Sequence, residues 1–358
     1  MSHWLPFLVL SVPFGALAER FDCRRLIQIA QGLFAFVSLA WGVLFITGTL
    51  QVWEACVLLV LHGCAGALWG PAEQLLLHDF VDRENLPSAI RLNATFRNLG
   101  VLCGPVVGSA LLILAGPQLG ILLNIALYLP MTLLLVRVRA TGHLRDGGVG
   151  TRVSIPETLR VLRRVASNRT IVSMMVVAGL AALTVGGAIQ PSMPNFADKL
   201  GAGSGDLGYG LLLFANGAGG VLGGFALEAT GWLKPDARTA IYTTVAFGVT
   251  TLVFATTGWY WLAIVALVAG GVANIASASA SQSVVQLEAP PAERGRIVGA
   301  YSVFANGTRT FGGLVLGGLG LAIGTTATVA WLAVALVVGS VVTAIVLATA
   351  ARRRAVGV

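Results

Sequence analysis

The sequence predicts an all-α membrane protein, and two observations carry that prediction. Its mean hydropathy is +0.84, with 56% hydrophobic and only 11% charged residues, a balance that excludes a soluble domain of 358 residues. Apolar runs of about 20 residues recur along the chain, and a helix of about that length crosses the hydrocarbon core of a bilayer. We therefore expect the chain to cross a membrane many times.

Eleven apolar segments are expected as membrane-spanning helices. In chain order they cover 4–18, 26–47, 52–77, 88–115, 118–136, 169–193, 207–231, 239–257, 259–284, 296–322 and 326–350. The first is short, since its residues rise only about 22 Å as a helix. A signal peptide is not expected there, because no basic region precedes the run and no small-x-small cleavage site follows it.

The basic residues predict the orientation of these spans. Nearly all of the 23 Lys and Arg residues fall in every second gap, while the gaps at 47–51, 115–118, 256–259 and 324–326 carry none. Cationic loops stay in the cytoplasm during insertion, which predicts an outside N-terminus and an inside C-terminus. The net charge of +8 is this loop bias. The expected partner is the lipid bilayer and not nucleic acid, because no basic run is interleaved with aromatics.

A polar, basic segment divides the chain in two. We expect an N-terminal bundle of five spans at 1–136, a cytoplasmic linker at 137–168, a C-terminal bundle of six spans at 169–350 and a tail at 351–358. Shifting the sequence by 208 residues places Phe96 on Phe304 and Asn98 on Asn306, which favours two parallel repeats. Five spans against six predict that one span is missing before the first.

The loop after the first span carries an ordered motif. Gly15-Ala-Leu17-Ala-Glu19-Arg20 is followed closely by Arg24 and Arg25. A glycine lets two helix ends approach, a carboxylate can cap a helix N-terminus or pair with Arg, and the cations hold the loop at the inner leaflet. The stretch resembles the G-x-L-a-D-R-x-G-R-R signature of the major facilitator superfamily, with Glu19 in place of Asp and Asp22-Cys23 in place of x-Gly.

A second motif lies in segment 88–115. Gly100, Gly104, Pro105 and Gly108 follow the spacing of the g-x-x-x-G-P-x-x-G-G motif of exporters in that superfamily, which they resemble; Ser109 departs from it. Small residues four apart form a flat face for close helix packing, and the proline bends the helix. Plain small-xxx-small packing would explain the same pattern.

The stretch from Gly70-Pro71-Ala72 through Leu86-Pro87-Ser88-Ala89 to Asn93 is similar to the enterobactin-exporter and macrolide-efflux branch. His78 and Glu73 depart from that branch. The resemblance implies two parallel-repeat helical bundles with about eleven of twelve helices present, the motif loop serving as a conformational latch. It implies a monomer in the bacterial cytoplasmic membrane that exports amphiphilic small molecules of the drug or siderophore class by alternating access.

The coupling ion stays open, with protons one candidate, because no acid lies unambiguously inside a span. A solute importer of the same fold and a non-transporting membrane protein are the alternatives. No cofactor and no enzymatic activity are expected, since no catalytic triad and no G-x-x-x-x-G-K-[ST] phosphate-binding loop is present.

Several polar residues fall inside the predicted spans. Arg97 and Arg309 take equivalent faces of repeat-related helices, and an Arg inside a bilayer usually faces the bundle interior. They are expected either to line a cavity or to pair structurally, for instance Arg97 or Arg91 with Glu73; the second interpretation is preferred. Candidates for a cavity lining are Asn93, Arg97, Asn216, Asn274, Ser277, Ser281, Gln282 and Arg309.

The cysteines and histidines predict no metal site and no disulfide framework. Cys23 lies in a predicted loop, and Cys56, Cys64 and Cys103 lie in apolar helices without C-x-x-C spacing. The four histidines, His3, His62, His78 and His143, are scattered along the sequence.

Overall fold

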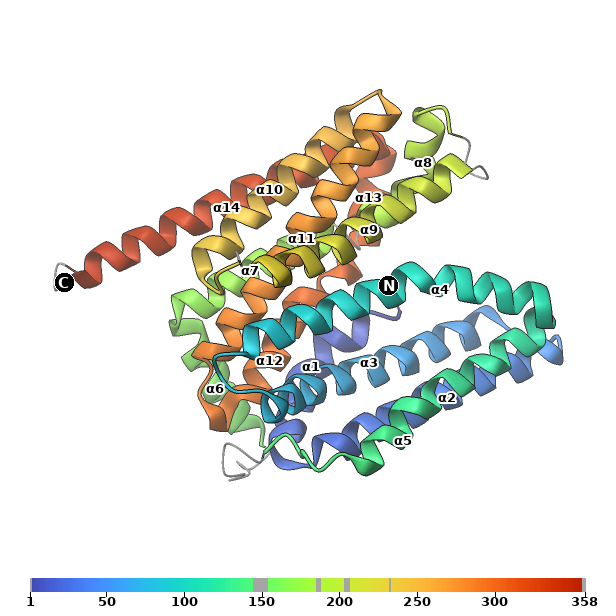
Figure 1. The fold of residues 1–358 in the computed structure, drawn as a ribbon, viewed down its shortest axis with the longest axis horizontal. Coiled ribbons are helices and arrows are strands. Elements are labelled where there is room, and N and C mark those ends of the chain that lie inside the picture. The colour runs from blue at the N-terminus through green and yellow to red at the C-terminus, as the bar shows by residue number, and fades with distance from the viewer. Residues whose placement is uncertain (1, 144–153, 185–187, 203–206, 232, 356–358) are drawn as a thin grey trace. The chain divides into compact units, whose positions relative to one another are not determined.

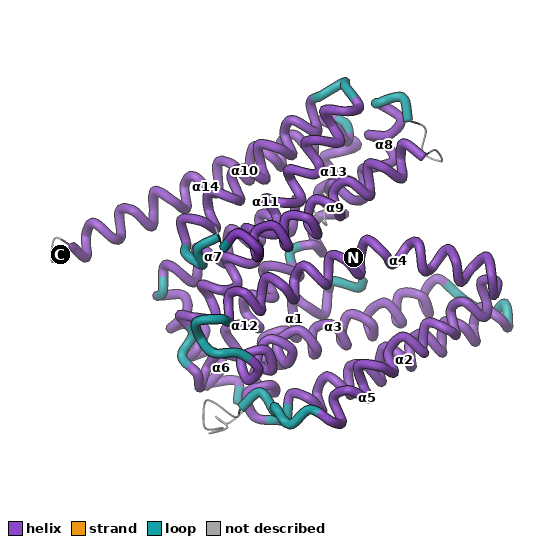
Figure 2. Tube along the Cα trace, in the orientation of Figure 1, coloured by secondary structure: helices purple, strands orange, loops and turns teal. Residues whose placement is uncertain are grey.

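The structure is a computed structural model that describes residues 2–143, 154–184, 188–202, 207–231 and 233–355. In these ranges all regular structure is helical (Figures 1 and 2). The elements are α1 Leu5–Arg20, α2 Cys23–Ile46, α3 Val52–Phe80, α4 Leu86–Leu123, η1 Asn124–Tyr128, α5 Leu129–Arg137, α6 Ile155–Ser167, α7 Arg169–Thr184, α8 Gln190–Lys199, α9 Leu207–Thr230, α10 Ala237–Thr256, α11 Tyr260–Glu288, η3 Pro291–Glu293, α12 Arg294–Ser302, η4 Val303–Gly307, α13 Arg309–Ile323 and α14 Thr325–Ala355.

The helices form two compact units, each assembled from separate parts of the sequence. Unit 1 comprises Met1–Leu86, Cys103–Arg164 and Ala289–Gly307. Its core forms because α2 buries a stripe at helical spacing that includes Ile27, Ala30 and Phe34, and this stripe packs with residues of α3. α1 and α3 also lie side by side (Figure 1). Asp22 starts α2 by accepting the Arg24 N–H at 3.0 Å.

Unit 2 comprises Pro87–Leu102, Val165–Glu288 and Thr308–Val358. Its core is built from α7–α11 and α14, with the rings of Phe196 and Phe254 4.4 Å apart and Phe247 also buried. Asp236 starts α10 by accepting the Thr239 N–H at 2.7 Å, and Asn168 accepts the first N–H groups of α7. The helix α4 thus begins in unit 2 and ends in unit 1. The sequence analysis predicted two bundles separated by the segment 137–168. The two units do not follow that boundary in the sequence, and the predicted bundles stay a prediction.

Each predicted span falls on helical structure, yet the predicted count of eleven is not confirmed. Among the described residues, seven helical stretches are long and apolar enough to cross a membrane, or up to eight if a bent pair, α6 with α7, counts as one span. The physical reason is that several spans are short or broken. α1 has 16 residues, the segment 296–322 is divided into α12, the π-helix η4 and α13, and α4 has a non-helical residue at Gly116, whose φ is 74°.

The predicted linker contains a helix that the sequence analysis did not anticipate. α6 buries Val161 and Val165, while Ile155 and Leu159 are exposed beside the exposed Arg160. Apolar and cationic faces on one short helix are typical of a segment that lies along a membrane surface. Of the rest of the linker, residues 144–153 lie outside the described residues.

Candidate functional site: the helix contacts and buried charges

The glycine of the predicted motif loop lies where two helices cross in unit 1. A methyl group at Gly15 would lie 2.1 Å from the Gly295 carbonyl oxygen, and one at Gly299 would lie 2.3 Å from the Ser11 carbonyl oxygen. α1 and α12 therefore approach backbone to backbone, which only residues without a side chain permit. This contact sets the position of the carboxylate one turn further along α1.

Glu19 binds the first turn of α12 through both of its carboxylate oxygens. Its Oε1 accepts the Arg296 backbone N–H at 2.7 Å, and its Oε2 lies 3.1 Å from Arg296 Nε. The side chains of Glu19 and Arg296 are 4% and 0% exposed, so this is a buried ion pair. Glu19 thus both pairs with an arginine and holds an N-terminal N–H group of a helix.

The other residues of the motif loop make contacts of their own around this ion pair. Arg24 Nη2 bonds Asp22 Oδ2 at 2.6 Å and Arg24 Nη1 donates to the Val138 carbonyl oxygen. Burial opposes ionisation of Asp22, but the hydrogen bonds and charge of Arg24 outweigh it, so the pKa of Asp22 lies below its ordinary value of 3.8. Leu17 packs against the unit 1 core, whereas Arg20 and Arg25 are exposed.

Unit 2 holds a second ion pair that the sequence analysis missed. Arg91, at the start of α4, donates to Glu228 Oε2 on α9 at 2.9 Å and to the Leu227 carbonyl oxygen at 3.1 Å. Ser88 donates to the same carboxylate. Arg91 therefore bonds Glu228, not Glu73 as one sequence interpretation held. A signal was present, because Gly224 precedes Glu228 by the same four residues that separate Gly15 from Glu19.

The α4 helix packs on α9 through glycines that belong to α9. Methyl groups at Gly217, Gly220 and Gly224 would meet Leu102, Asn98 and Thr95 of α4 at 2.9, 3.2 and 1.9 Å. By contrast, methyl groups at Gly100, Gly104 and Gly108 would meet no atom within 4 Å among the described residues. The sequence analysis expected another helix to pack closely against these three glycines of the exporter-like motif. The described residues show no such contact at them. Pro105 lies in the same helix, and its side chain is not described.

Unit 2 contains both of the arginines predicted to take equivalent helix faces. Arg309 begins α13, with one residue between it and the π-helix, and Arg97 lies on α4. Arg97 is exposed, Arg309 is half-buried and its Nε is buried. Asn93, one turn before Arg97, is half-buried. An arginine eleven residues into a long helix usually faces the bundle interior or water rather than lipid.

The polar residues of α11 differ in burial. Ser277 and Ser281 are buried, and the Ser277 hydroxyl bonds that of Thr244 on α10, so this serine joins two helices of the bundle. Asn274 lies on the same face as the two serines by helical spacing but is half-buried, as is Gln282. Asn216 on α9 is half-buried as well, and its carbonyl oxygen would lie 2.4 Å from a methyl group at Gly271.

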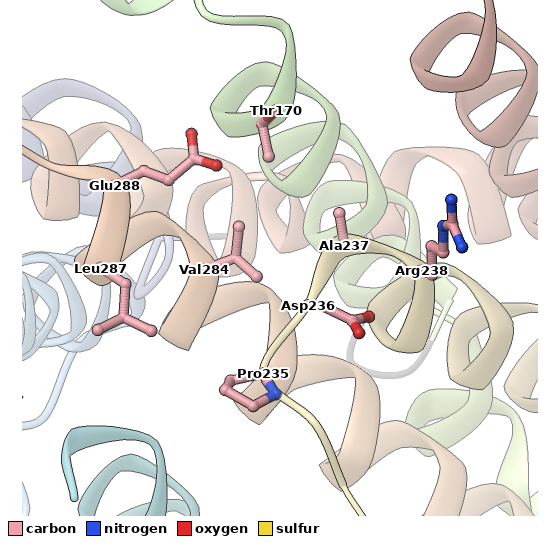
Figure 3. Close-up of a pocket in the computed structure, with 8 residues that line it drawn as sticks. All are labelled: Thr170, Pro235, Asp236, Ala237, Arg238, Val284, Leu287 and Glu288. Carbon is pink, nitrogen blue, oxygen red and sulfur yellow. The ribbon is translucent and has the colours of Figure 1, made fainter. Parts of the chain in front are cut away.

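A cavity of about 500 Å³ lies in unit 2 where α7 and α10 begin and α11 ends (Figure 3). Asp236, Arg238 and Glu288 are the charged residues of its lining. Asp236 caps α10 and Glu288 accepts from Asn168, so both acids have structural bonds. The position at helix ends separates this cavity from the arginines on α4 and α13. In the described part of the chain, no group of three or more His, Cys, Asp or Glu side chains could hold a metal.

Comparison with known proteins places these features in a family. The family model described as transmembrane secretion effector, of the major facilitator superfamily, matches residues 1–354. A Na(+), Li(+), K(+)/H(+) antiporter of Planococcus maritimus is 22% identical over 320 residues, covering 81% of this chain and 73% of that protein.

Solved structures share the fold. The human organic anion transporter MFSD10 has a TM-score of 0.80 at 13% identity and covers 96% of this chain and 82% of its own. The Escherichia coli fucose:proton symporter has a TM-score of 0.70 at 13% identity and covers 96% and 89%.

Proposed function

Because the chain belongs to the transmembrane secretion effector family of the major facilitator superfamily, and is therefore a multi-pass membrane transporter, we propose what it carries. We infer that it exports amphiphilic small molecules bearing an anionic group, as a secondary active transporter in the bacterial cytoplasmic membrane. The drug and siderophore classes are those that the resemblance to the enterobactin-exporter and macrolide-efflux branch implies. The chain acts as a monomer, with protons as the coupling ion.

The observation that carries this proposal is the presence of two arginines within the long helical segments of unit 2, the exposed Arg97 on α4 and the half-buried Arg309 at the start of α13. An arginine inside a membrane-spanning segment usually faces the bundle interior, where a cationic lining attracts an anionic group on a solute. A guanidinium also matches a carboxylate or phosphate with paired N–H groups. The relative named for organic anion transport, with its TM-score of 0.80, supports the same substrate class.

The conformational cycle follows from the two ion pairs. Glu19–Arg296 and Glu228–Arg91 each join a helix that precedes the 137–168 segment to one that follows it. Alternating access rocks two repeats about a midplane site, so contacts of this kind hold one state and must part in the other. We call them the unit 1 latch and the unit 2 latch. The motif residues Gly15, Leu17, Glu19, Arg20, Arg24 and Arg25 form the loop of the first.

Transport in vesicles tests the substrate class. Purified protein in liposomes should take up carboxyfluorescein, an organic anion, and much less ethidium, an organic cation. Arg97→Gln and Arg309→Gln should each slow carboxyfluorescein uptake at least about tenfold, since one charged hydrogen bond contributes about 1.5–3 kcal/mol. Arg163→Gln changes an exposed arginine of α6 and is the matched control. Faster ethidium than carboxyfluorescein transport in wild type would contradict the anionic class.

The structural alternative for Arg97 has its own test. If Glu73 holds Arg97, Arg97→Ala lowers the membrane yield, and the double change with Glu73→Ala recovers much of the loss, because no lone buried charge remains. If Arg97 binds substrate, Arg97→Ala leaves the melting temperature unchanged and abolishes anion transport. Yield and transport measured on the same three proteins separate the two.

A further inference from the structure

The structure brings together two histidines that lie 59 residues apart in sequence. His3 Nδ1 and His62 Nδ1 are 3.3 Å apart, and their ring centroids are 5.0 Å apart. Both side chains are half-buried in unit 1. His62 lies ten residues after the first residue of α3, which places it about 15 Å along the helix. His62 therefore lies within the long apolar helix α3, away from both of its ends.

Close packing fixes the pair. A methyl group at Gly63 would lie 2.1 Å from the His3 carbonyl oxygen, so the chain before α1 rests directly on α3 beside His62. Aromatic rings surround the imidazoles: Trp4 lies 4.6 Å from His3 and Phe34 lies 4.6 Å from His62, between ring centroids. This enclosure keeps the two rings facing each other.

His62 also faces a cavity of about 350 Å³ within unit 1. The polar groups of its lining come from α2 and the segment around η1, where Asn124 donates to the Ser38 hydroxyl at 3.3 Å and to the Tyr128 hydroxyl at 3.4 Å. None of its lining residues is Asp, Glu, Lys or Arg. Hydroxyl and amide groups of this kind can pass a proton through water to an imidazole.

Among the described residues, the side chains in ring contact with the pair are aromatic. α1 and α2 contribute the apolar rings of Trp4, Phe7 and Phe34, and η1 contributes the Tyr128 phenol to the shared cavity. Along α3 the next titratable groups are Cys64 and, eight residues before His62, Glu54, which accepts the Gln51 N–H at the helix start.

We propose that His3 and His62 form the proton-carrying site of this transporter and hold one proton in each transport cycle. In the neutral pair, one Nδ1–H donates to the lone pair of the other Nδ1. A proton from water adds to a ring-nitrogen lone pair and makes a monocation whose charge the two rings share. Its release to water on the other side restores the neutral pair, with no other bond formed or broken.

A second proton is excluded by geometry. Two imidazolium rings would carry an N–H on both Nδ1 atoms, so the bond at 3.3 Å would become a contact between two donors and two like charges. The site therefore sets a stoichiometry of one. It also lies on the latch helix, because His3 precedes α1 and Glu19 is near its end. A displacement of α1 that parts the unit 1 latch would change the distance between the two histidines.

The transport experiment rests on the proposed function. Vesicles holding the full chain are loaded one pH unit more acidic inside, with the membrane potential clamped, and carboxyfluorescein is added outside. One proton exchanged per anion supports about tenfold accumulation. His62→Gln and His3→Gln should accumulate none, while both still exchange internal for external carboxyfluorescein at equal pH. His143→Gln, which changes a half-buried histidine bonded to the Phe21 carbonyl oxygen, should accumulate like wild type. Folded His62→Gln and His3→Gln proteins that still accumulate the dye about tenfold would overturn the proposal.

A second measurement is independent of transport. In protein labelled with ¹⁵N in its four histidines, we expect a scalar coupling between the Nδ1 atoms of His3 and His62 and the uptake of a single proton by the pair, both lost in His62→Gln. Two histidines that titrate separately, without coupling, would overturn the site. A wild-type protein that moves no dye but shows the coupling would contradict the anion proposal and leave the proton site standing.

Discussion

The two latches are built alike but differ in how far water reaches them. In each, a glutamate near the end of one helix holds an arginine at the start of another. The side chains of Glu19 and Arg296 are 4% and 0% exposed, whereas those of Glu228 and Arg91 are 27% and 7% exposed. The first pair sits under a crossing of two glycine backbones, and the second sits at the end of a helix contact that involves glycines on one side only.

This difference predicts unequal energies. A buried ion pair loses the hydration of both charges, so it stabilises little in total, yet removing one partner leaves a buried charge and costs about 3–5 kcal/mol. A pair that keeps part of its hydration costs less to form and less to break. We infer that the unit 2 latch opens at lower cost and that the unit 1 latch sets the more rigid contact.

The largest effect is expected from Glu19→Gln. It leaves Arg296 without its counter-charge and should lower the free energy of unfolding by about 3–5 kcal/mol, against about 1–3 kcal/mol for Glu228→Gln. Thermal unfolding in detergent measures both. Replacing the whole pair, Glu19→Leu with Arg296→Met, should recover most of the loss. Equal losses in the two single variants would remove the distinction between the latches.

A smaller effect is expected from the glycines. Gly15→Ala puts a methyl group 2.1 Å from a backbone oxygen that has no room to move, which should cost about 1–3 kcal/mol. Gly220→Ala is the matched change in unit 2, where the neighbour is the Asn98 side chain at 3.2 Å and can shift. Gly100→Ala meets open space and should stabilise α4 by about 0.5–1 kcal/mol. A Gly220→Ala loss as large as that of Gly15→Ala would contradict the asymmetry.

The next effect in size is expected from the aspartates that cap helices, Asp22 at the start of α2 in unit 1 and Asp236 at the start of α10 in unit 2. Asp22→Ala removes a cap and an ion pair and should cost about 1 kcal/mol at neutral pH. Since the folded pKa of Asp22 is below 3.8, its stabilisation is present above that pH and is lost as the pH falls below it. The difference between wild type and variant should therefore shrink in acid. Asp236→Ala, which removes the α10 cap, is the control in unit 2. If the difference in unfolding free energy between wild type and Asp22→Ala grows as the pH falls, the ionised carboxylate of Asp22 is not what stabilises the fold.

The smallest effect is expected from Arg20→Ala. The motif resemblance places Arg20 in the latch, but its side chain is exposed and lies over the Phe21 ring at 5.6 Å. The unfolding free energy should change by less than about 0.5 kcal/mol. A transport rate close to that of wild type would assign the latch to Glu19 and Arg296. A loss of transport without loss of stability would give Arg20 a separate conformational role.

The sequence predicted the features that rest on short-range patterns. Apolar runs located the helices, and Gly15 to Glu19 could be identified because the motif is contiguous. The partners of that motif could not be predicted, since Arg296 lies 277 residues away. His3 and His62 appeared scattered for the same reason, as a contact across 59 residues leaves no periodic trace.

Breaks inside helices were also invisible in the sequence. The π-helix at 303–307 interrupts a continuous apolar run, and hydropathy does not register a change of hydrogen-bond pattern. The composition of the α6 segment, rich in arginine, predicts a linker. The spacing of its apolar residues by three or four predicts an amphipathic helix instead: Ile155, Leu159, Leu162 and Val165.

The discontinuity of unit 1 has a consequence for the way the protein is made. Glu19 leaves the ribosome 277 residues before Arg296, which at 5–20 residues per second is about 14–55 s. Arg91 waits for a partner only 137 residues later, or about 7–27 s. During synthesis the nascent chain therefore makes both partners of the unit 2 latch first, and Glu19 at the end of α1 waits about twice as long for Arg296 as Arg91 waits for Glu228.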